Sequence, residues 1–141
     1  MKLLKALCFA WLLGALTPAQ AEQMKQLGDW DVHYIALTSS FLTPEVARAY
    51  GIQRSKYSAL VNISVLDSAT KEAQKVLVTG SATDLMGRAK PLEFKEINEG
   101  KAIYYIATMG FRYEEDMRFE INISNGNQRQ TLRFNQKLYA E

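Results

Sequence analysis

Apolar and polar residues alternate with a period of two along most of this chain, and this pattern restricts the fold more than any other feature. From Trp30 to Ala36 the apolar residues share one face of an extended segment, and from Met117 to Ser124 the alternation returns in its clearest form. Successive side chains of a strand point to opposite faces of its sheet, so the pattern indicates half-buried strands. Further segments of this kind are 59–66, 74–82, 92–94, 102–109 and 132–138.

Turn-forming residues separate these segments. Asn125-Gly126 is typical of a hairpin because both residues tolerate a positive φ, and Gly100 predicts another hairpin before Ile103. Segment 102–109 is apolar on both faces, which favours a central strand. About seven short strands joined by turns predict an all-β fold, an immunoglobulin-like β-sandwich. A small β-barrel is the runner-up, because the strand pattern alone does not decide closure.

One short helix is expected after the first strand. Thr43 is a suitable N-cap, Pro44 fits the first helical position, and Gly51 can end the helix in the left-handed conformation. Two turns are too few for a helix to be stable alone, so it must pack against a sheet.

The first residues have the layout of a secretory signal. Two lysines precede an apolar run over residues 6–16, and Ala19-Gln20-Ala21 places small residues before a cleavage point. The run is shorter than the roughly 20 residues that a membrane-spanning helix needs. We therefore expect a signal peptide over 1–21 with cleavage after Ala21, a single β-sandwich domain over 22–141, no transmembrane segment in the mature chain, and a periplasmic location.

Removal of the leader changes the charge and the thiol content. Of the 141 residues, 120 remain, and without Lys2 and Lys5 they carry 15 basic and 15 acidic residues. A net charge near zero argues against nucleic acid as a partner. Cys8, the only cysteine, leaves with the leader. The mature chain then has neither a disulfide nor a thiol nucleophile, and its core alone must stabilise it.

Catalytic motifs are absent from the sequence. It contains no G-x-S-x-G elbow, H-E-x-x-H pair, Walker loop or glycine-rich dinucleotide motif, and His33 is its only histidine. We expect a protein that is not an enzyme and that needs no cofactor.

Asp29, Asp31 and His33 form the sharpest cluster of polar residues. Alternate residues of a strand project from one face roughly 6.5–7 Å apart, so neighbouring members could share a metal ion only by leaning together. The main interpretation is a solvated outer face opposite Trp30, and a metal or acid–base site is the weaker alternative. The acidic run 114–116 is expected to be a solvated turn at the start of a strand.

A second group of candidate residues surrounds the predicted helix. Arg48, Tyr50, Arg54 and Lys56 could bind an acidic group or the carboxylates of a partner. The alternative is that these cations only keep the surface soluble. Tyr104 and Tyr105 point to opposite faces of their strand, so at most one of them belongs to the inner core. Packing in the core or on the sheet face is the main interpretation, and an exposed aromatic that joins an interface is the alternative.

Several segments together resemble a known family. They are residues 26–34 (QLGDWDVHY), 43–52 (TPEVARAYGI), Arg54-Ser55-Lys56, 62–65 (NISV) and 121–124 (INIS), which appear in the expected order. They resemble domain-of-unknown-function family 4426, small secreted proteins of Gram-negative bacteria. The resemblance implies a periplasmic, single-domain protein and carries no activity.

Three functions stay open at this point. The first is a non-catalytic binding or accessory module that meets a protein or an envelope component through the helix-containing loop, residues 41–56, or through an edge strand. The second is a small-ligand or metal-binding protein, and the third is an enzyme that depends on His33.

Overall fold

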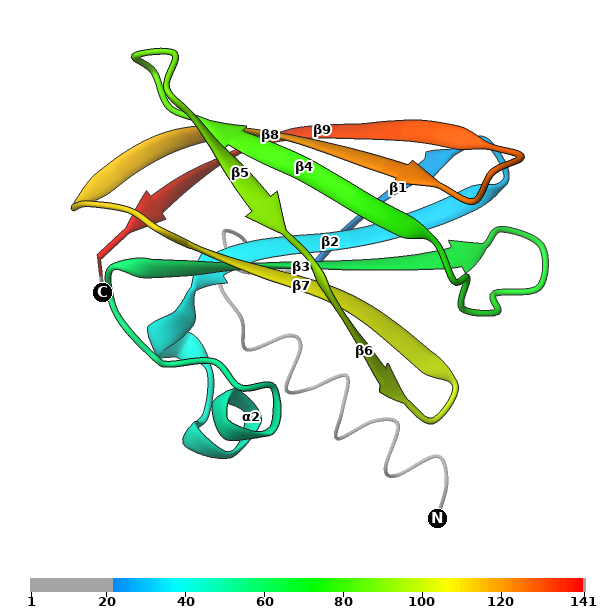
Figure 1. Cartoon of the computed structure of the whole chain (residues 1–141), viewed down its shortest axis with the longest axis horizontal. Coiled ribbons are helices and arrows are strands. Elements are labelled where there is room, and N and C mark those ends of the chain that lie inside the picture. The colour runs from blue at the N-terminus through cyan, green and yellow to red at the C-terminus, as the bar shows by residue number, and fades with distance from the viewer. Residues whose placement is uncertain (1–21, 141) are drawn as a thin grey trace.

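The computed structural model describes residues 22–140, which form two antiparallel β-sheets packed face to face (Figure 1). The predicted leader and Cys8 lie outside the described residues. The elements are β1 (Gln23–Leu27), β2 (Trp30–Thr38), η2 (Ser39–Phe41), α2 (Pro44–Ala49), β3 (Ser58–Asp67), β4 (Leu77–Thr83), β5 (Ala89–Glu93), β6 (Lys95–Glu99), β7 (Ala102–Gly110), β8 (Glu114–Ser124) and β9 (Arg129–Tyr139).

The strand order is that of an immunoglobulin-like sandwich. One sheet has the order β1-β2-β3-β7-β6, here called sheet A, and the other the order β5-β4-β8-β9, here called sheet B. Without β1, these orders match strands A-B-E-D and C′-C-F-G of the immunoglobulin fold. The predicted β-sandwich is therefore confirmed. The runner-up barrel is wrong, because within residues 22–140 the strands form two separate sheets, each with two edge strands.

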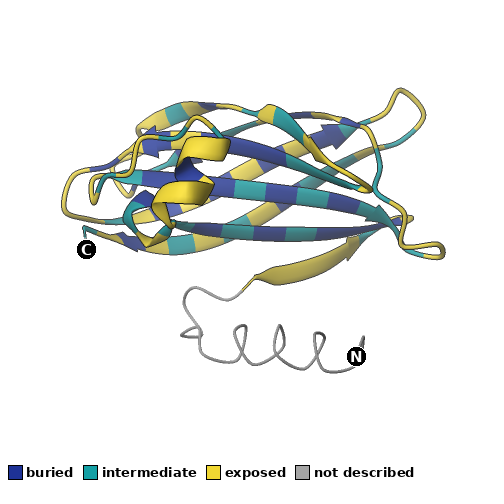
Figure 2. Cartoon of the chain, turned by 90° about the horizontal axis from the view of Figure 1, so that it is seen from below, coloured by how far each residue is buried: buried dark blue, intermediate teal, exposed yellow. Residues whose placement is uncertain are grey.

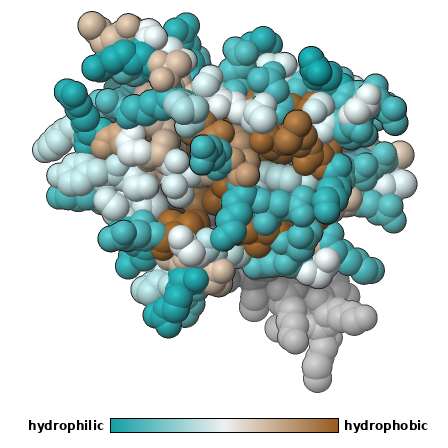
Figure 3. All heavy atoms as spheres, in the orientation of Figure 1, coloured by the Kyte–Doolittle hydropathy of each residue, from teal (hydrophilic) through white to brown (hydrophobic). Residues whose placement is uncertain are grey.

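The core between the sheets follows the predicted alternation. Trp30, Val32 and Tyr34 of β2 are buried, as are Phe119 and Ile121 of β8. Aromatic rings join the two sheets, since the ring of Phe134 lies 4.5 Å from that of Tyr34 and 4.7 Å from that of Phe119. Apolar side chains of both sheets thus share one cluster. On the face seen in Figure 3, hydrophobic atoms surface near the middle of the molecule and hydrophilic atoms surround them.

The short helix forms as the sequence predicts. The Thr43 hydroxyl accepts a hydrogen bond from the Val46 N–H at 3.2 Å, and Pro44 occupies the first turn. Such a cap stabilises a helix by about 1 kcal/mol. Gly51 follows with a φ of 69° and ends the helix. Figure 2 shows α2 lying across the outer face of sheet A, and Ala47 is its buried residue.

Two strands differ from the predicted set. β1 has no alternating apolar face, and four of its five residues are exposed, so the pattern missed it. The predicted strand around Leu92 and Phe94 is divided in two. β5 ends at Glu93 in sheet B and β6 begins at Lys95 in sheet A, so the chain passes from one sheet to the other at Phe94.

Two predicted turns also differ in detail. The acidic run Glu114-Glu115-Asp116 is not a turn but the first part of β8, paired with residues 137–139 of β9. The hairpin at Asn125 is confirmed, with four connecting residues between the paired Ser124 and Arg129. The Asn125 carboxamide oxygen accepts the N–H groups of residues 127 and 128, which fixes this longer turn.

Candidate binding groove

A groove of about 290 Å³ lies between the segment that follows α2 and the outer face of strands β6 and β7. Ile52 on one side and Ile97 and Ile106 on the other give it an apolar floor. Ile106 is only 5% exposed, although it points away from the core between the sheets. Lys95 and Glu93 bring opposite charges to the rim. The groove therefore combines apolar contact area with charges of both signs.

The segment after α2 is held in place by backbone and side-chain bonds. The N–H of Ile52 donates to the Ala47 carbonyl at 2.8 Å, which folds the chain back under the helix. The Tyr50 hydroxyl donates to a carboxylate oxygen of Glu99 at 2.7 Å, at the β6–β7 hairpin. Burial, together with the hydrogen bond and charge of Glu99, raises the pKa of Tyr50 to about 12. This phenol stays protonated at neutral pH, and Tyr50 is one of the residues that line the groove.

The groove also adjoins a strand edge. β6 is the last strand of sheet A. Gly100 and Lys101 form a two-residue turn between the paired Glu99 and Ala102. In such a hairpin the two residues that flank the turn, Glu99 and Ala102, exchange both of their backbone hydrogen bonds. Every second pair along the ladder does the same, so the backbone N–H and C=O groups of the residues in between, Glu96 and Asn98, face the free edge. An incoming extended segment could pair there, which is the usual route of strand addition.

The structure separates the four predicted binding residues. Only Tyr50 lines the groove. Arg54 donates to the Ser40 carbonyl at 2.8 Å, and the Lys56 ammonium lies 5.2 Å from the centre of the Tyr57 ring. Arg48 is exposed in the last turn of α2. Arg54 thus reaches back to η2, which precedes the helix, whereas Lys56 contacts its neighbour in the connecting segment between α2 and β3.

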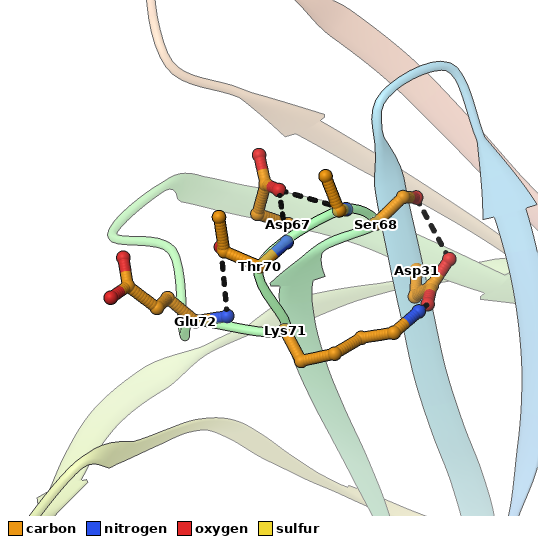
Figure 4. Close-up of polar contacts among 7 residues, drawn as sticks. Asp31, Asp67, Ser68, Thr70, Lys71 and Glu72 are labelled. Atoms are coloured by element: carbon orange, nitrogen blue, oxygen red, sulfur yellow. Dashed lines mark hydrogen bonds and ion pairs between the residues drawn. The ribbon is translucent and has the colours of Figure 1, made fainter.

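Asp31 departs from its predicted solvated position. The Asp31 residue is 5% exposed, because the connection from β3 to β4 folds over it. The Ser68 hydroxyl donates to one carboxylate oxygen at 2.8 Å, and the Lys71 ammonium binds the other at 2.5 Å (Figure 4). These two partners, Lys71 first, hold the pKa of Asp31 below its usual value of 3.8.

The connection that covers Asp31 is itself well ordered by local bonds. An Asp67 carboxylate oxygen accepts the N–H groups of Ala69 and Thr70, both at 2.9 Å. Lys71 has a φ of 62°, a conformation that non-glycine residues rarely adopt. Figure 4 shows how this backbone turn directs the Lys71 side chain back to Asp31. The arrangement is that of a structural clamp.

The three predicted metal ligands, Asp29, Asp31 and His33, therefore have different surroundings. His33 Nδ1 lies 3.2 Å from a Glu22 carboxylate oxygen, and Asp29 is exposed in the β1–β2 turn. Across residues 22–140, no three histidine, cysteine or acidic side chains are placed to hold a metal ion together. This geometry lends the metal hypothesis no support.

A larger hollow, about 460 Å³, lies on the outer face of sheet B. Its walls include Arg133 and Glu120, whose charged groups are 3.6 Å apart. The nearby edge of β9 is faced by β1, since the Lys25 ammonium donates to the Arg133 carbonyl at 3.0 Å. The Glu120 carboxylate is thus paired within this hollow and the adjoining strand edge is faced by β1, so we regard the groove beside β6 as the better candidate site.

Sequence reasoning did not find the groove. It identified Tyr50, but Lys95, Ile97 and Ile106 were missed. The alternation around Leu92 extends into Phe94 without a visible break, so nothing marked Lys95–Glu99 as a separate edge strand. The predicted hairpin at Gly100 was the one available signal that a strand preceded it.

Comparison with known proteins gives a family and a fold. A family model described as a domain of unknown function, DUF4426, matches residues 24–141. The crystal structure of a protein of that family from Pseudomonas aeruginosa PAO1 is 38% identical and has a TM-score of 0.74, covering 85% of this chain and 96% of its own. No curated protein matches the sequence.

More distant structures share the fold alone. FetP of the uropathogenic Escherichia coli strain F11, expressed in the periplasm, is 8% identical with a TM-score of 0.61, covering 87% of this chain and 95% of FetP. A copper-bound variant of FetP is 9% identical with the same TM-score, covering 86% and 95%. In residues 22–140, no helix has the length and hydropathy needed to cross a membrane.

Proposed function

Since the chain belongs to the DUF4426 family, whose function is unknown, we propose from its own residues that it is a non-catalytic binding module of the Gram-negative periplasm. Export rests on the leader-like sequence of residues 1–21. The absence of catalytic motifs and the engagement of His33 and Asp31 in local ion pairs favour binding over catalysis. The likeness to FetP brings neither copper nor a site to this chain.

The groove beside β6 supports this proposal best. Its partner is an extended segment of another protein that pairs with the free edge of β6 and places an apolar side chain over Ile97 and Ile106. Lys95 and Glu93 at the rim favour a segment with one acidic and one basic residue near that apolar side chain. The observation that carries the proposal is the apolar floor next to an unpaired strand edge.

In-cell crosslinking tests the proposal. A photo-crosslinking residue replaces Lys95 at the groove, and a matched variant carries it at Arg129, an exposed position beside the turn between β8 and β9. We expect the Lys95 position to capture a specific envelope protein that the Arg129 position does not capture. The substitution Ile97→Asp should weaken this capture about tenfold, as the loss of a central apolar contact does.

Two results would contradict the proposal. One is the same set of captured proteins from both positions. The other is unchanged capture in the Ile97→Asp protein, with circular dichroism verifying that the variant still folds.

A further inference from the structure

The edge of β6 is open to further strand pairing. Proteins protect such edges with proline, with bulges, with a covering segment or with charges. β5, an edge of sheet B, contains Pro91, and the β9 edge is faced by β1. β6 has neither proline nor glycine, and its five residues pair with β7 in regular register. Charges are its remaining protection, and their order decides which strand can pair with it.

The charges of β6 complement a second copy of the same strand. Alternate side chains share a face, so Lys95, Ile97 and Glu99 lie together on the outer face of sheet A, with Ile97 in the middle. When a second copy runs antiparallel about a two-fold axis at Ile97, Lys95 of each copy lies opposite Glu99 of the other. Opposite charges directly across a strand pair stabilise it, and like charges destabilise it.

Both charges are available for such a contact. Among residues 22–140, neither Lys95 nor Glu99 takes part in an ion pair. Glu99 accepts a hydrogen bond from the Tyr50 hydroxyl, which is a neutral donor and leaves the negative charge of the carboxylate in place. An ammonium from a second copy would therefore supply the missing counter-charge.

The backbone of β6 fits the same register. Glu96 and Asn98 turn their N–H and C=O groups to the free edge, so these two residues must face each other across a new antiparallel ladder. With the axis at Ile97, Glu96 of each copy exchanges both hydrogen bonds with Asn98 of the other. The two Ile97 residues then form a close pair without hydrogen bonds, with Cα atoms about 4.5 Å apart.

Other registers and the other edge of sheet A fit less well. A shift by two residues is the smallest that keeps the outward backbone groups facing each other. It places Glu96 opposite Glu96 in one direction and Lys95 opposite Lys101 in the other. On β1, the full-length two-fold register puts Lys25 opposite Lys25. Like charges therefore disfavour each of these arrangements, and only the register about Ile97 pairs unlike charges.

We infer that β6 pairs with β6 of a second copy across a two-fold axis, so that the two A sheets form one continuous antiparallel sheet in a homodimer. The Ile97 side chains meet on the axis, and a Lys95–Glu99 pair lies on each side of them. The same edge is the one proposed above for a partner segment, so the second copy covers it until that segment displaces it. This regulatory consequence, unlike the dimer itself, rests on the proposed function.

Charge reversal tests the pairing and its register together. The full chain is expressed with its leader, the exported protein is purified, and sedimentation equilibrium measures its association over a range of concentrations. We expect a reversible dimer. Lys95→Glu puts acidic residues opposite each other at both ends of the ladder, and Glu99→Lys puts basic residues there. Each variant alone should therefore dimerise roughly tenfold less tightly than the unaltered protein.

An equimolar mixture of the two variants tests the register directly. In a mixed pair the two changed residues lie opposite each other, as do the two unchanged ones, and both contacts join unlike charges. The mixture should therefore regain the affinity of the unaltered dimer. Glu99→Lys also removes the bond from Tyr50, and recovery in the mixture would show that this loss is not the cause. Arg129→Glu, the same charge change at an exposed distant position, should leave the dimer unchanged.

Several results would overturn the inference. They are a protein that stays monomeric up to millimolar concentration, a dimer that Lys95→Glu does not weaken, a mixture without recovery, and equal weakening by Arg129→Glu. Circular dichroism verifies that each variant folds. Because these measurements use the pure protein, a missing dimer leaves the crosslinking test of the proposed function unaffected. A dimer without a captured envelope protein would contradict the proposed function alone.

Discussion

Asp31 shows how the surroundings of a single residue depend on a distant part of the chain. The alternation of β2 places it on the face away from the core, where a carboxylate is usually hydrated. Ser68 and Lys71, far along the chain, cover it and supply the hydrogen bonds that replace water. Local spacing predicts which face a side chain takes. It does not predict which connection later folds across that face.

The pH dependence of stability should reveal this clamp. The folded-state pKa of Asp31 lies below the usual value of 3.8, so its ion pair stabilises the fold above about pH 4 and that contribution is lost as the pH falls through the folded-state pKa. Asp31→Asn should lower the melting temperature at pH 7, and the difference from the unaltered protein should shrink below pH 4. Thermal unfolding monitored by circular dichroism measures this difference.

Asp29→Asn is the control, because Asp29 is exposed in the neighbouring turn. A melting-temperature difference for Asp31→Asn that is constant from pH 7 to pH 3 would contradict the role of the charge. Other carboxylates with a lowered pKa, such as Asp84, destabilise the unaltered protein and the Asp31→Asn protein equally in acid. The difference in melting temperature between these two proteins therefore does not include their effect.

Among the elements, those with a clear period were predictable from the sequence and those defined only by their partners were not. Strands β2, β3 and β8 bury alternate side chains, and α2 carries its own cap and terminator. β1 is an edge strand with little buried surface, so no apolar period identifies it. The division between β5 and β6 depends on which neighbour each one pairs with, and pairing leaves no local signature.

Close packing of β4 against β8 gives a prediction for an element. A Cβ atom on Gly80 would lie 2.6 Å from the Glu120 carbonyl oxygen, closer than real Cβ contacts. Gly80→Ala should therefore push the two strands apart and lower the free energy of unfolding by about 1–3 kcal/mol. Urea denaturation gives this value directly.

Gly110→Ala is the companion variant. At Gly110 the nearest atom to an added Cβ is 3.9 Å away, and its φ is not in the left-handed region. Its free energy of unfolding should stay the same or rise by up to about 1 kcal/mol. Equal losses for Gly80→Ala and Gly110→Ala would mean that the close approach to β8 is not the cause.

For the molecule as a whole, the fold class follows from a global pattern of the sequence, whereas the groove does not. Each amphipathic strand of the sandwich can be recognised in a continuous stretch of sequence, and the export leader is predicted from a stretch of the same kind. The groove joins Ile52 after the helix to Ile97 and Ile106 of two paired strands, so its floor exists only once sheet A is complete. That is why Tyr50 was identified without the residues opposite it.

Export is testable on the whole chain. Because residues 1–21 have the layout of a cleavable leader, mass spectrometry of protein from the periplasmic fraction should give a chain that begins at Glu22. That chain contains no cysteine, so its melting temperature should be the same with and without reductant. Recovery of the intact chain from the cytosol would contradict the predicted compartment.

The passage of the chain from sheet B to sheet A at Phe94 has a mechanical consequence. One nearly continuous ribbon begins beside the exposed Leu85-Met86 turn and ends under the groove. At about 3.3 Å per residue, Ala89 and Ile97 are separated by roughly 25 Å. A force applied at the Leu85-Met86 turn would therefore be transmitted along this ribbon to β6, the strand whose free edge we propose as the pairing site for a partner segment.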